Sequence, residues 1–311
     1  MKREQDFESQ DLMATIHAIN TPSAVAAFRS QLLEYYTLTK PEVNLLILMS
    51  TSAGYYLASQ GAFRFSRFVA TLIGTLLVAS GTATLNQFME RFHDAKMRRT
   101  ANRPAASGRL SPQSVFWFGL LLSVAGGAYL KLAVNPLTAL LALSTLLSYL
   151  LVYTPLKRKT SLCTLLGAFP GAMPVLIGWA GASGRFGWNA WFLFAILFLW
   201  QFPHFLAIAL MYREDYERAG FRMLPGFDRD GRFTRAEILT LTIVLLVVTL
   251  LPQYSRGSVG YLICMLAAGG FFLYHSLRLA QSSDRKLAGR VLHASVVYLP
   301  MILVIMVIWK P

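Results

Sequence analysis

The sequence predicts an all-α, polytopic membrane protein with nine transmembrane helices, and three observations support this prediction. Hydrophobic residues make up 55% of the 311 residues and charged residues only 14%, whereas about a quarter of a typical soluble chain is charged. Apolar segments of about 20 residues, the length needed to cross a bilayer core, recur along the chain. Lys and Arg concentrate in alternate connecting loops, which is the pattern of the positive-inside rule.

The nine segments expected to cross the membrane are separated by short polar loops. They run over residues 43–60, 66–87, 113–133, 136–155, 162–182, 188–210, 236–253, 258–277 and 291–309. Each is long enough to span the hydrocarbon layer as an α-helix.

The loops predict the orientation of the chain. Most of the 29 Lys and Arg residues lie in the N-terminal arm and in the second, fourth, sixth and eighth loops. We therefore expect a cytoplasmic N-terminus and a C-terminus on the outer side. The formal net charge of +14 is then mainly a topology signal, and no nucleic-acid partner is expected.

The N-terminal arm lacks the features of a targeting peptide. Residues 1–20 contain four acidic side chains and no apolar core, unlike secretory signals or mitochondrial presequences. A bacterial inner (plasma) membrane is the expected location. We expect two parts, a cytoplasmic arm over residues 1–41 and a transmembrane domain over residues 42–311, with an interfacial helix over residues 28–41.

The first polar cluster ends the second predicted span. Asn86, Glu90 and Asp94 are spaced by four residues and therefore share one face of a helix. Oxygen ligands of this kind suit Mg²⁺, which often bridges to substrate phosphates. The basic residues that follow, Arg98, Arg99 and Arg103, match phosphate oxygens. An ordinary charged loop with ion pairs between successive turns is the alternative.

A second acidic cluster, which includes Asp215, follows the sixth predicted span. The predicted topology puts it on the same side as the first cluster, so Asn86, Glu90, Asp94 and Asp215 are candidate metal ligands. The short loop with Lys157 and Arg158 lies on that side too and is a candidate diphosphate clamp. An ordinary positive-inside loop is its alternative.

The sixth span also contains His204, directly after Pro203. An ionisable side chain inside a span is costly and is usually paired or functional. Three interpretations stay open for His204: a local hydrogen bond, a ligand for a metalloporphyrin, or a proton shuttle. Glycines in the fifth span indicate close helix packing or a lined cavity.

Several motifs taken together resemble the UbiA superfamily of intramembrane prenyltransferases, and most closely its branch that farnesylates heme. The similarity runs from Lys40-Pro41 to the last span. The motifs are Asn86-x-x-x-Glu90-x-x-x-Asp94-x-x-Met97-x-Arg99, Tyr153-Thr154-x-Leu156-Lys157-Arg158, Gly171-Ala-x-Pro174-x-x-x-Gly178-Trp179, Trp200-x-Phe-Pro-His204-Phe and Asp215-Tyr216-x-x-Ala219-Gly220.

The resemblance implies nine helices around a central cavity that opens to the cytoplasm. It implies that farnesyl diphosphate is the donor, heme b the acceptor, heme O the product and Mg²⁺ the cofactor, with membrane lipid and heme A synthase as partners. It assigns Asn86, Glu90 and Asp94 to the first metal-diphosphate motif and Asp215 to the second.

The same resemblance makes His204 a heme-binding residue. Tyr153 and Tyr212 would line the cavity and face the cationic intermediate. One departure is Ala219, which stands where many members have a second aspartate. Another acceptor such as a quinone precursor, a transporter, and a non-catalytic heme-binding factor are the alternative functions.

Overall fold

The protein is described from a computed structural model, which covers residues 24–251, 258–282 and 284–310. Helices and their connections account for these residues, and no strand occurs among them. The helices are α2 (Ala24–Leu38), α3 (Pro41–Ala58), α4 (Phe65–Asp94), α5 (Pro112–Ala133), α6 (Pro136–Leu147), η1 (Ser148–Tyr153), α7 (Thr154–Leu156), α8 (Cys163–Ser183), α9 (Trp188–Met211), α10 (Arg213–Arg218), α11 (Leu224–Phe227), α12 (Arg232–Thr249), α13 (Val259–Ala280) and α14 (Arg285–Ile308). The predicted all-α fold is confirmed.

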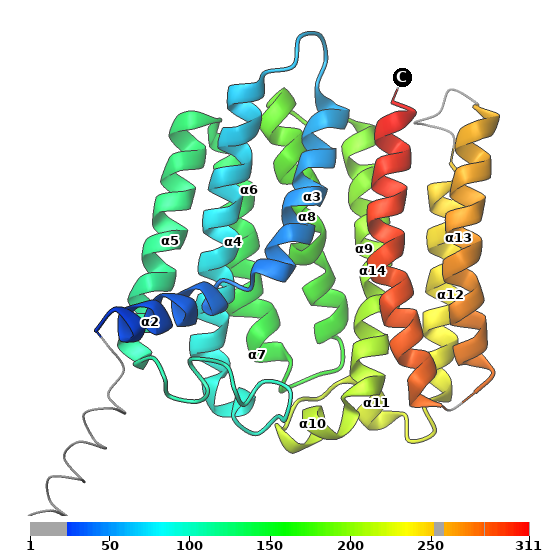
Figure 1. Cartoon of the computed structure of the whole chain (residues 1–311). Helices are drawn as coiled ribbons and strands as arrows, with labels where there is room; N and C mark the ends of the chain where they lie inside the picture. Colours follow the sequence, from blue (N-terminus) through cyan, green and yellow to red (C-terminus); the bar gives the residue numbers. More distant parts are fainter. Residues whose placement is uncertain (1–23, 252–257, 283, 311) are drawn as a thin grey trace, which may run out of the picture.

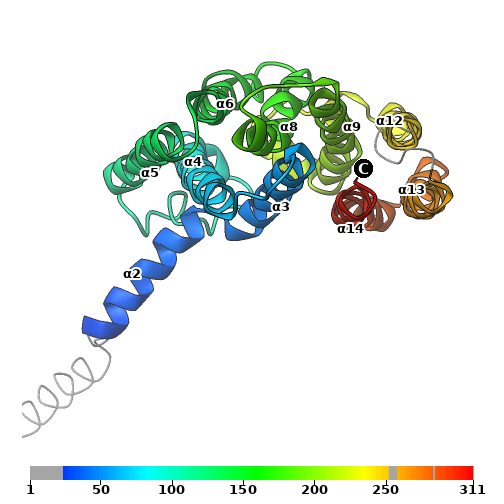
Figure 2. The same ribbon diagram turned by 90° about the horizontal axis from the view of Figure 1, so that it is seen from above.

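The long helices stand side by side along one common direction (Figure 1). Seen along that direction, they follow a curved path from α5 and α4 through α6, α8 and α9 to α12 and α13 (Figure 2). Helix α3 packs on α8 and α4, and α14 packs on α9, α13 and α3. The contact between α14 and α3 joins the two halves of the bundle.

Seven helices of the described residues are long and apolar enough to cross a membrane: α4, α5, the α6–α7 segment, α8, α9, α13 and α14. The chain is therefore a multi-pass membrane protein. Helices α3 and α12 run alongside them (Figure 1) but are more polar. Helix α12 begins with Arg232, Arg235 and Glu237, and α3 contains Glu42 and Asn44. That nine helices cross the membrane, and that the N-terminus is cytoplasmic, remain predictions.

Close contact between α3 and α8 depends on glycine. A Cβ atom at Gly54 would overlap the carbonyl oxygen of Val175, and one at Gly178 would overlap that of Thr51. Glycine at such positions lets two helix backbones approach each other inside a membrane bundle. The glycines of the fifth predicted span thus serve helix packing.

A widened helical turn, η1, connects α6 to α7 at the end of the fourth span. Pro155 follows it and has no backbone N–H to donate to the preceding turn. The Oγ1 hydroxyl of Thr154 donates to the carbonyl of Tyr149, five residues back, at 2.9 Å. Such π-type turns are frequent at functional sites, and this one turns Tyr149 and Tyr153 toward Lys157.

Helix α2 lies across the direction of the bundle and extends away from it (Figures 1 and 2). Its exposed apolar side chains include Val25, Phe28 and Leu32. Its last residue is held in place, because Leu38 is buried and its carbonyl accepts a hydrogen bond from Gln87 at 2.9 Å. These features suit the predicted interfacial helix, which begins earlier than expected. The rest of the predicted arm, residues 1–23, lies outside the described residues.

Candidate active site

Helix α4 carries the first acidic cluster inside its last turns. It continues to Asp94, seven residues beyond the predicted end of the second span at residue 87. Asn86, Glu90 and Asp94 are 1%, 6% and 2% exposed. A buried carboxylate is costly unless a cation or hydrogen-bond donors compensate it. The partners of these three side chains therefore define the site.

Each of the three side chains is matched by a partner from another segment. The Glu90 carboxylate accepts hydrogen bonds from Lys157 Nζ at 2.9 and 3.2 Å. Arg103 NH1 donates to both Asp94 oxygens, at 2.9 and 2.8 Å. Asn86 Nδ2 donates to Thr154 Oγ1 at 3.2 Å. The i,i+4 ion pairs of the alternative interpretation are not how these carboxylates are satisfied.

The second cluster meets the first at the same end of the bundle. Asp215, on α10, is 7% exposed. Its carboxylate accepts hydrogen bonds from the backbone N–H of Arg99 at 3.3 Å and from Arg218 NH1 at 3.2 Å. Met97 packs with Ala219 and Phe221 in a small apolar core that joins the two loops.

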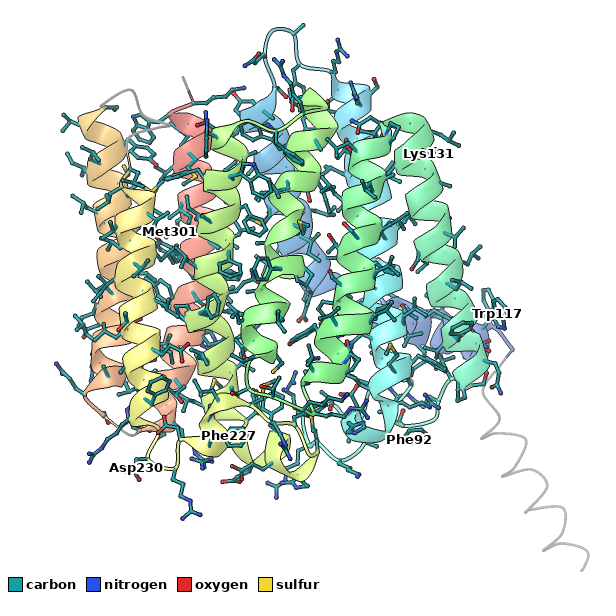
Figure 3. The ribbon with its side chains drawn as sticks, turned by 180° about the vertical axis from the view of Figure 1, so that it is seen from behind. Phe92, Trp117, Lys131, Phe227, Asp230 and Met301 are labelled. Carbon is teal, nitrogen blue, oxygen red and sulfur yellow. The ribbon has the colours of Figure 1, made fainter. Side chains whose placement is uncertain are left out.

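Figure 3 shows this end of the molecule, where Phe92, Phe227 and Asp230 lie, whereas Lys131 marks the opposite end. Asp94 and Asp215, predicted to share one side of the membrane, thus lie at one end of the bundle. The ionic residues Glu90, Asp94, Arg103, Lys157, Asp215 and Arg218 are called the carboxylate site below.

Aromatic rings face Lys157 of the carboxylate site and the neighbouring Arg99. The Lys157 ammonium lies 4.4 Å from the centre of the Tyr153 ring and 5.9 Å from that of Tyr149. The Arg99 guanidinium lies 5.2 Å from the Tyr212 ring centre. Rings that contact a cation in this way present their negative faces to positive charge. Tyr153 and Tyr212 thus lie beside the carboxylate site.

Two lysines of this region differ in their protonation. Burial by itself lowers the pKa of Lys157, but Tyr153 and the Glu90 carboxylate outweigh it and hold the pKa well above the usual value. Lys157 is therefore a permanent cation. Burial, followed by the charges of Arg103 and Lys157, lowers the pKa of Lys40 to about 7. Lys40 is thus charged in only part of the molecules at neutral pH.

His204 lies two turns before the end of α9 and is half-buried. Its Nδ1 lies 2.8 Å from Ser295 Oγ, and that hydroxyl donates its own hydrogen to the Leu292 carbonyl at 2.6 Å. Nδ1 must therefore be the donor to Ser295, which leaves Nε2 of the neutral ring with a free lone pair. Trp200 stacks on the imidazole, with ring centres 4.8 Å apart.

Not every predicted residue lies among the buried ion pairs. Arg98 and Arg158 are exposed and form no ion pair with a described residue. The sequence interpretation gave no role in the site to Lys40, Thr154, Arg218 or Ser295. Arg218 has a sequence signal, since it lies three residues after Asp215 on one helix. Ser295 has none, because it is 91 residues from His204.

The carboxylate site contains the oxygen donors that Mg²⁺ prefers, but they are not assembled around a common point. Within the described residues, no three His, Cys, Asp or Glu side chains are close enough to share one ion. Basic side chains hold the carboxylates instead. The donor set fits Mg²⁺ if the ion arrives with a diphosphate that draws the basic groups to itself. A cavity of about 740 Å³ lies at the other end of the bundle, and the predicted central cavity stays a prediction.

The family model that matches the chain is that of the UbiA prenyltransferase family, over residues 47–297. The chain is 47% identical over 289 residues to the protoheme IX farnesyltransferase of Solibacter usitatus, a match covering 89% of this chain and 99% of the relative. It is 45% identical to the protoheme IX farnesyltransferase of Koribacter versatilis, and the match covers 90% of this chain and 94% of the relative.

Solved structures share the fold at low sequence identity. A digeranylgeranylglyceryl phosphate synthase superposes with a TM-score of 0.73 and 16% identity, covering 90% of this chain and 98% of that one. A UbiA homolog from Archaeoglobus fulgidus bound to GPP and Mg²⁺ has a TM-score of 0.60 at 14% identity, with 88% and 99% covered. From the family match and its close relatives together, the chain belongs to the UbiA prenyltransferase family and, within it, to the protoheme IX farnesyltransferases.

Proposed function

We propose that this enzyme transfers the farnesyl group of farnesyl diphosphate to a vinyl group of heme b and so produces heme O. The carboxylate site is the observation that supports this proposal most directly. Three buried carboxylates and their basic partners, Lys157, Arg103 and Arg218, lie together at one end of an apolar bundle. Such a site suits a polar diphosphate head whose prenyl tail extends into the apolar bundle.

The basic residues would bind the diphosphate by exchanging partners. Lys157 and Arg103 are paired with Glu90 and Asp94 in the structure. Phosphate oxygens form strong charge-assisted hydrogen bonds with ammonium and guanidinium groups. We infer that both cations turn to the diphosphate, which frees Glu90, Asp94, Asn86 and Asp215 to hold Mg²⁺. When bound, Mg²⁺ would stabilise negative charge on the departing diphosphate.

The reaction begins as the C–O bond of the donor breaks and the electron pair leaves with the diphosphate. Lys157 and Arg103 stabilise that charge where water is largely excluded. The faces of Tyr153 and Tyr212 would stabilise the allylic cation. The vinyl group attacks C1 of the farnesyl cation to form a C–C bond. Water adds to the resulting porphyrin-side cation and loses a proton, which yields a hydroxyethylfarnesyl group.

His204 would orient the acceptor. Because the Nδ1–H of His204 donates a hydrogen bond to Ser295 Oγ, the lone pair of Nε2 is available for the iron of heme. His204 lies seven residues before the end of α9, which places it about 10 Å above the level of that end. A porphyrin held there would have its edge near the carboxylate site. The bacterial relatives support a bacterial inner membrane as the location, with heme A synthase as the enzyme that receives the product.

The test is Asp94→Asn in the purified full-length enzyme, assayed for heme O by mass spectrometry. We expect farnesyl transfer to fall at least about 100-fold. The substitution removes the negative charge of Asp94, which would bind the metal and which positions Arg103. Asp230→Asn is the matched control, because Asp230 is exposed at the same end (Figure 3). Turnover of Asp94→Asn within a few fold of wild type at saturating Mg²⁺ would refute the metal role. A prenylated quinone precursor in place of heme O would favour the alternative acceptor.

A further inference from the structure

The cavity at the end of the bundle opposite the carboxylate site has a distinct chemical character. Its volume is about 740 Å³. The residues that line it come from the α3–α4 and α8–α9 connections and from the helix ends beside them. They include three arginines and two tryptophans: Arg64, Arg67, Arg185, Trp179 and Trp188. No acidic residue lines it. We call it the arginine pocket.

The arginines of this pocket are not paired with any acidic side chain that the structure describes. The sequence explains this, because residues 43–89, 95–213 and 238–283 contain no Asp or Glu. Arg67 donates one bond to the Val134 carbonyl at 3.0 Å, yet its buried Nε has no partner. The pocket thus gathers positive charge that no acidic side chain of the described residues neutralises.

Two helix N-termini add to the positive potential of the pocket. Helix α4 begins after Arg64 and α9 after Gly187, and neither of these two N-cap residues forms a side-chain capping hydrogen bond. The positive end of the helix dipole favours anions. The neighbouring C-terminal carbonyls are already satisfied. Lys310 Nζ donates to the carbonyls of Tyr56 and Ser59 at 2.7 and 2.6 Å, and Ser183 Oγ donates to that of Trp179 at 3.0 Å.

The position of the pocket separates it from the reaction. Helix α3 has 18 residues between Lys40 and Ser59, which corresponds to about 27 Å. Lys40 is close enough to Glu90 and Asp94 for their charges to affect its pKa, whereas Ser59 lines the arginine pocket. A molecule in this pocket therefore lies far from the diphosphate.

We propose that the arginine pocket binds the phosphate of an acidic phospholipid. The pocket lies beside the loops at one end of the bundle, and tryptophan rings at the ends of transmembrane helices commonly lie among lipid headgroups. Arginine forks match phosphate oxygens. The exposed ring of Trp188 would lie along the lipid glycerol and upper acyl chains, while Arg64 and Arg185 bind the phosphate.

The test is native mass spectrometry of the full chain in detergent, titrated with phosphatidylglycerol or phosphatidylcholine. Wild type should bind one phosphatidylglycerol at least about tenfold more tightly than phosphatidylcholine. Arg64→Gln/Arg185→Gln should lose that preference, and both side chains are exposed, so the fold should persist. Lys131→Gln is the matched control, since Lys131 is an exposed cation of the same end outside the pocket (Figure 3).

Farnesyl transfer by the double variant in detergent should stay within about twofold of wild type, because the pocket is remote from the diphosphate. The proposal would be overturned if the double variant retained the phosphatidylglycerol preference, or if Lys131→Gln lost it equally. Displacement of the lipid by stoichiometric hemin or by free pyrophosphate would assign the pocket to those anions instead. The activity of Asp94→Asn tests the carboxylate site alone. The lipid-binding measurement can therefore succeed or fail independently of that test.

Discussion

Glu90 and Lys157 form a buried ion pair 67 residues apart in the chain, and each is less than a tenth exposed. Removing both charges from such a pair is often tolerated, whereas removing one leaves the other buried and uncompensated. The pair therefore couples stability to function at the level of single residues. A site that must release Lys157 to its substrate gains from a partner that holds the cation in place beforehand.

This coupling predicts the outcome of a double-mutant cycle. Lys157→Met should lower the free energy of unfolding by about 3–5 kcal/mol, because Glu90 is then unpaired. Glu90→Gln/Lys157→Met should recover most of that loss but remain inactive in farnesyl transfer. Denaturant unfolding in detergent measures the first quantity and a heme O assay the second. A double variant as unstable as Lys157→Met would show that the pair does not account for the loss.

The lowered pKa of Lys40 leads us to expect proton uptake when a prenyl diphosphate binds. Its pKa of about 7 results from burial and from the charges of Arg103 and Lys157. A negative diphosphate nearby raises the pKa, because opposite charge favours the protonated amine. At pH 8, where Lys40 is mostly neutral, binding should therefore take up a fraction of a proton approaching one.

Isothermal titration calorimetry in two buffers of different ionisation enthalpy measures this uptake. The comparison is between wild type and Lys40→Met, which cancels the titration of the diphosphate itself. Near pH 5.5, where Lys40 is already protonated, the difference between the two proteins should vanish. Equal uptake by both proteins at pH 8 would exclude Lys40 as the group that is protonated.

At the scale of elements, the α3–α8 contact determines how the two sides of the bundle meet. Gly178 faces the backbone of α3 so closely that any Cβ atom would overlap the Thr51 carbonyl. Backbone atoms cannot move aside as a flexible side chain can. The same two helices connect the two ends of the molecule, since α3 begins near the carboxylate site and ends at the arginine pocket.

Gly178→Ala should therefore destabilise the protein by about 2 kcal/mol or more, through overpacking of the helix contact. The matched control is Gly270→Ala on α13, where no atom lies within 4 Å of the added Cβ. That variant should be neutral or slightly stabilised, since alanine favours helices over glycine. Thermal unfolding in detergent compares the two. Equal melting temperatures would show that α3 and α8 can separate without cost.

For the whole molecule, the distribution of charge predicts the orientation. The carboxylate site and the loops that contain most of the Lys and Arg residues lie at the same end of the bundle. The positive-inside rule places the carboxylate site in the cytoplasm. This orientation would give the site access to a water-soluble metal ion and to a charged diphosphate.

Cysteine labelling checks this orientation in a background with Cys163 and Cys264 replaced by alanine. Ala62→Cys, in the exposed α3–α4 connection, should react with a membrane-impermeant maleimide in intact cells. Asp230→Cys, exposed at the other end, should react only after the membrane is broken. Labelling in the opposite order would invert the topology and move the carboxylate site to the outer face.

The parts of the fold that could be predicted are those marked by long apolar segments in the sequence. Apolar runs of bilayer length placed most helix ends within a few residues of those observed. The second span was predicted to end at 87, but α4 continues to Asp94, because the hydropathy signal ends where polar residues begin although the helix does not. The polar N-terminal turns of α12 were likewise left out of the seventh span.

The sequence alone determined the all-helical membrane fold, the family, and the grouping of the acidic residues on α4 and α10, because each depends on composition or on local spacing. Only the tertiary structure decided which cation faces which carboxylate, that Ser295 orients His204, and that three arginines from two separate parts of the chain line one pocket. Those pairings join residues far apart in the chain, and their partners are chosen by how the helices pack rather than by any pattern within a segment.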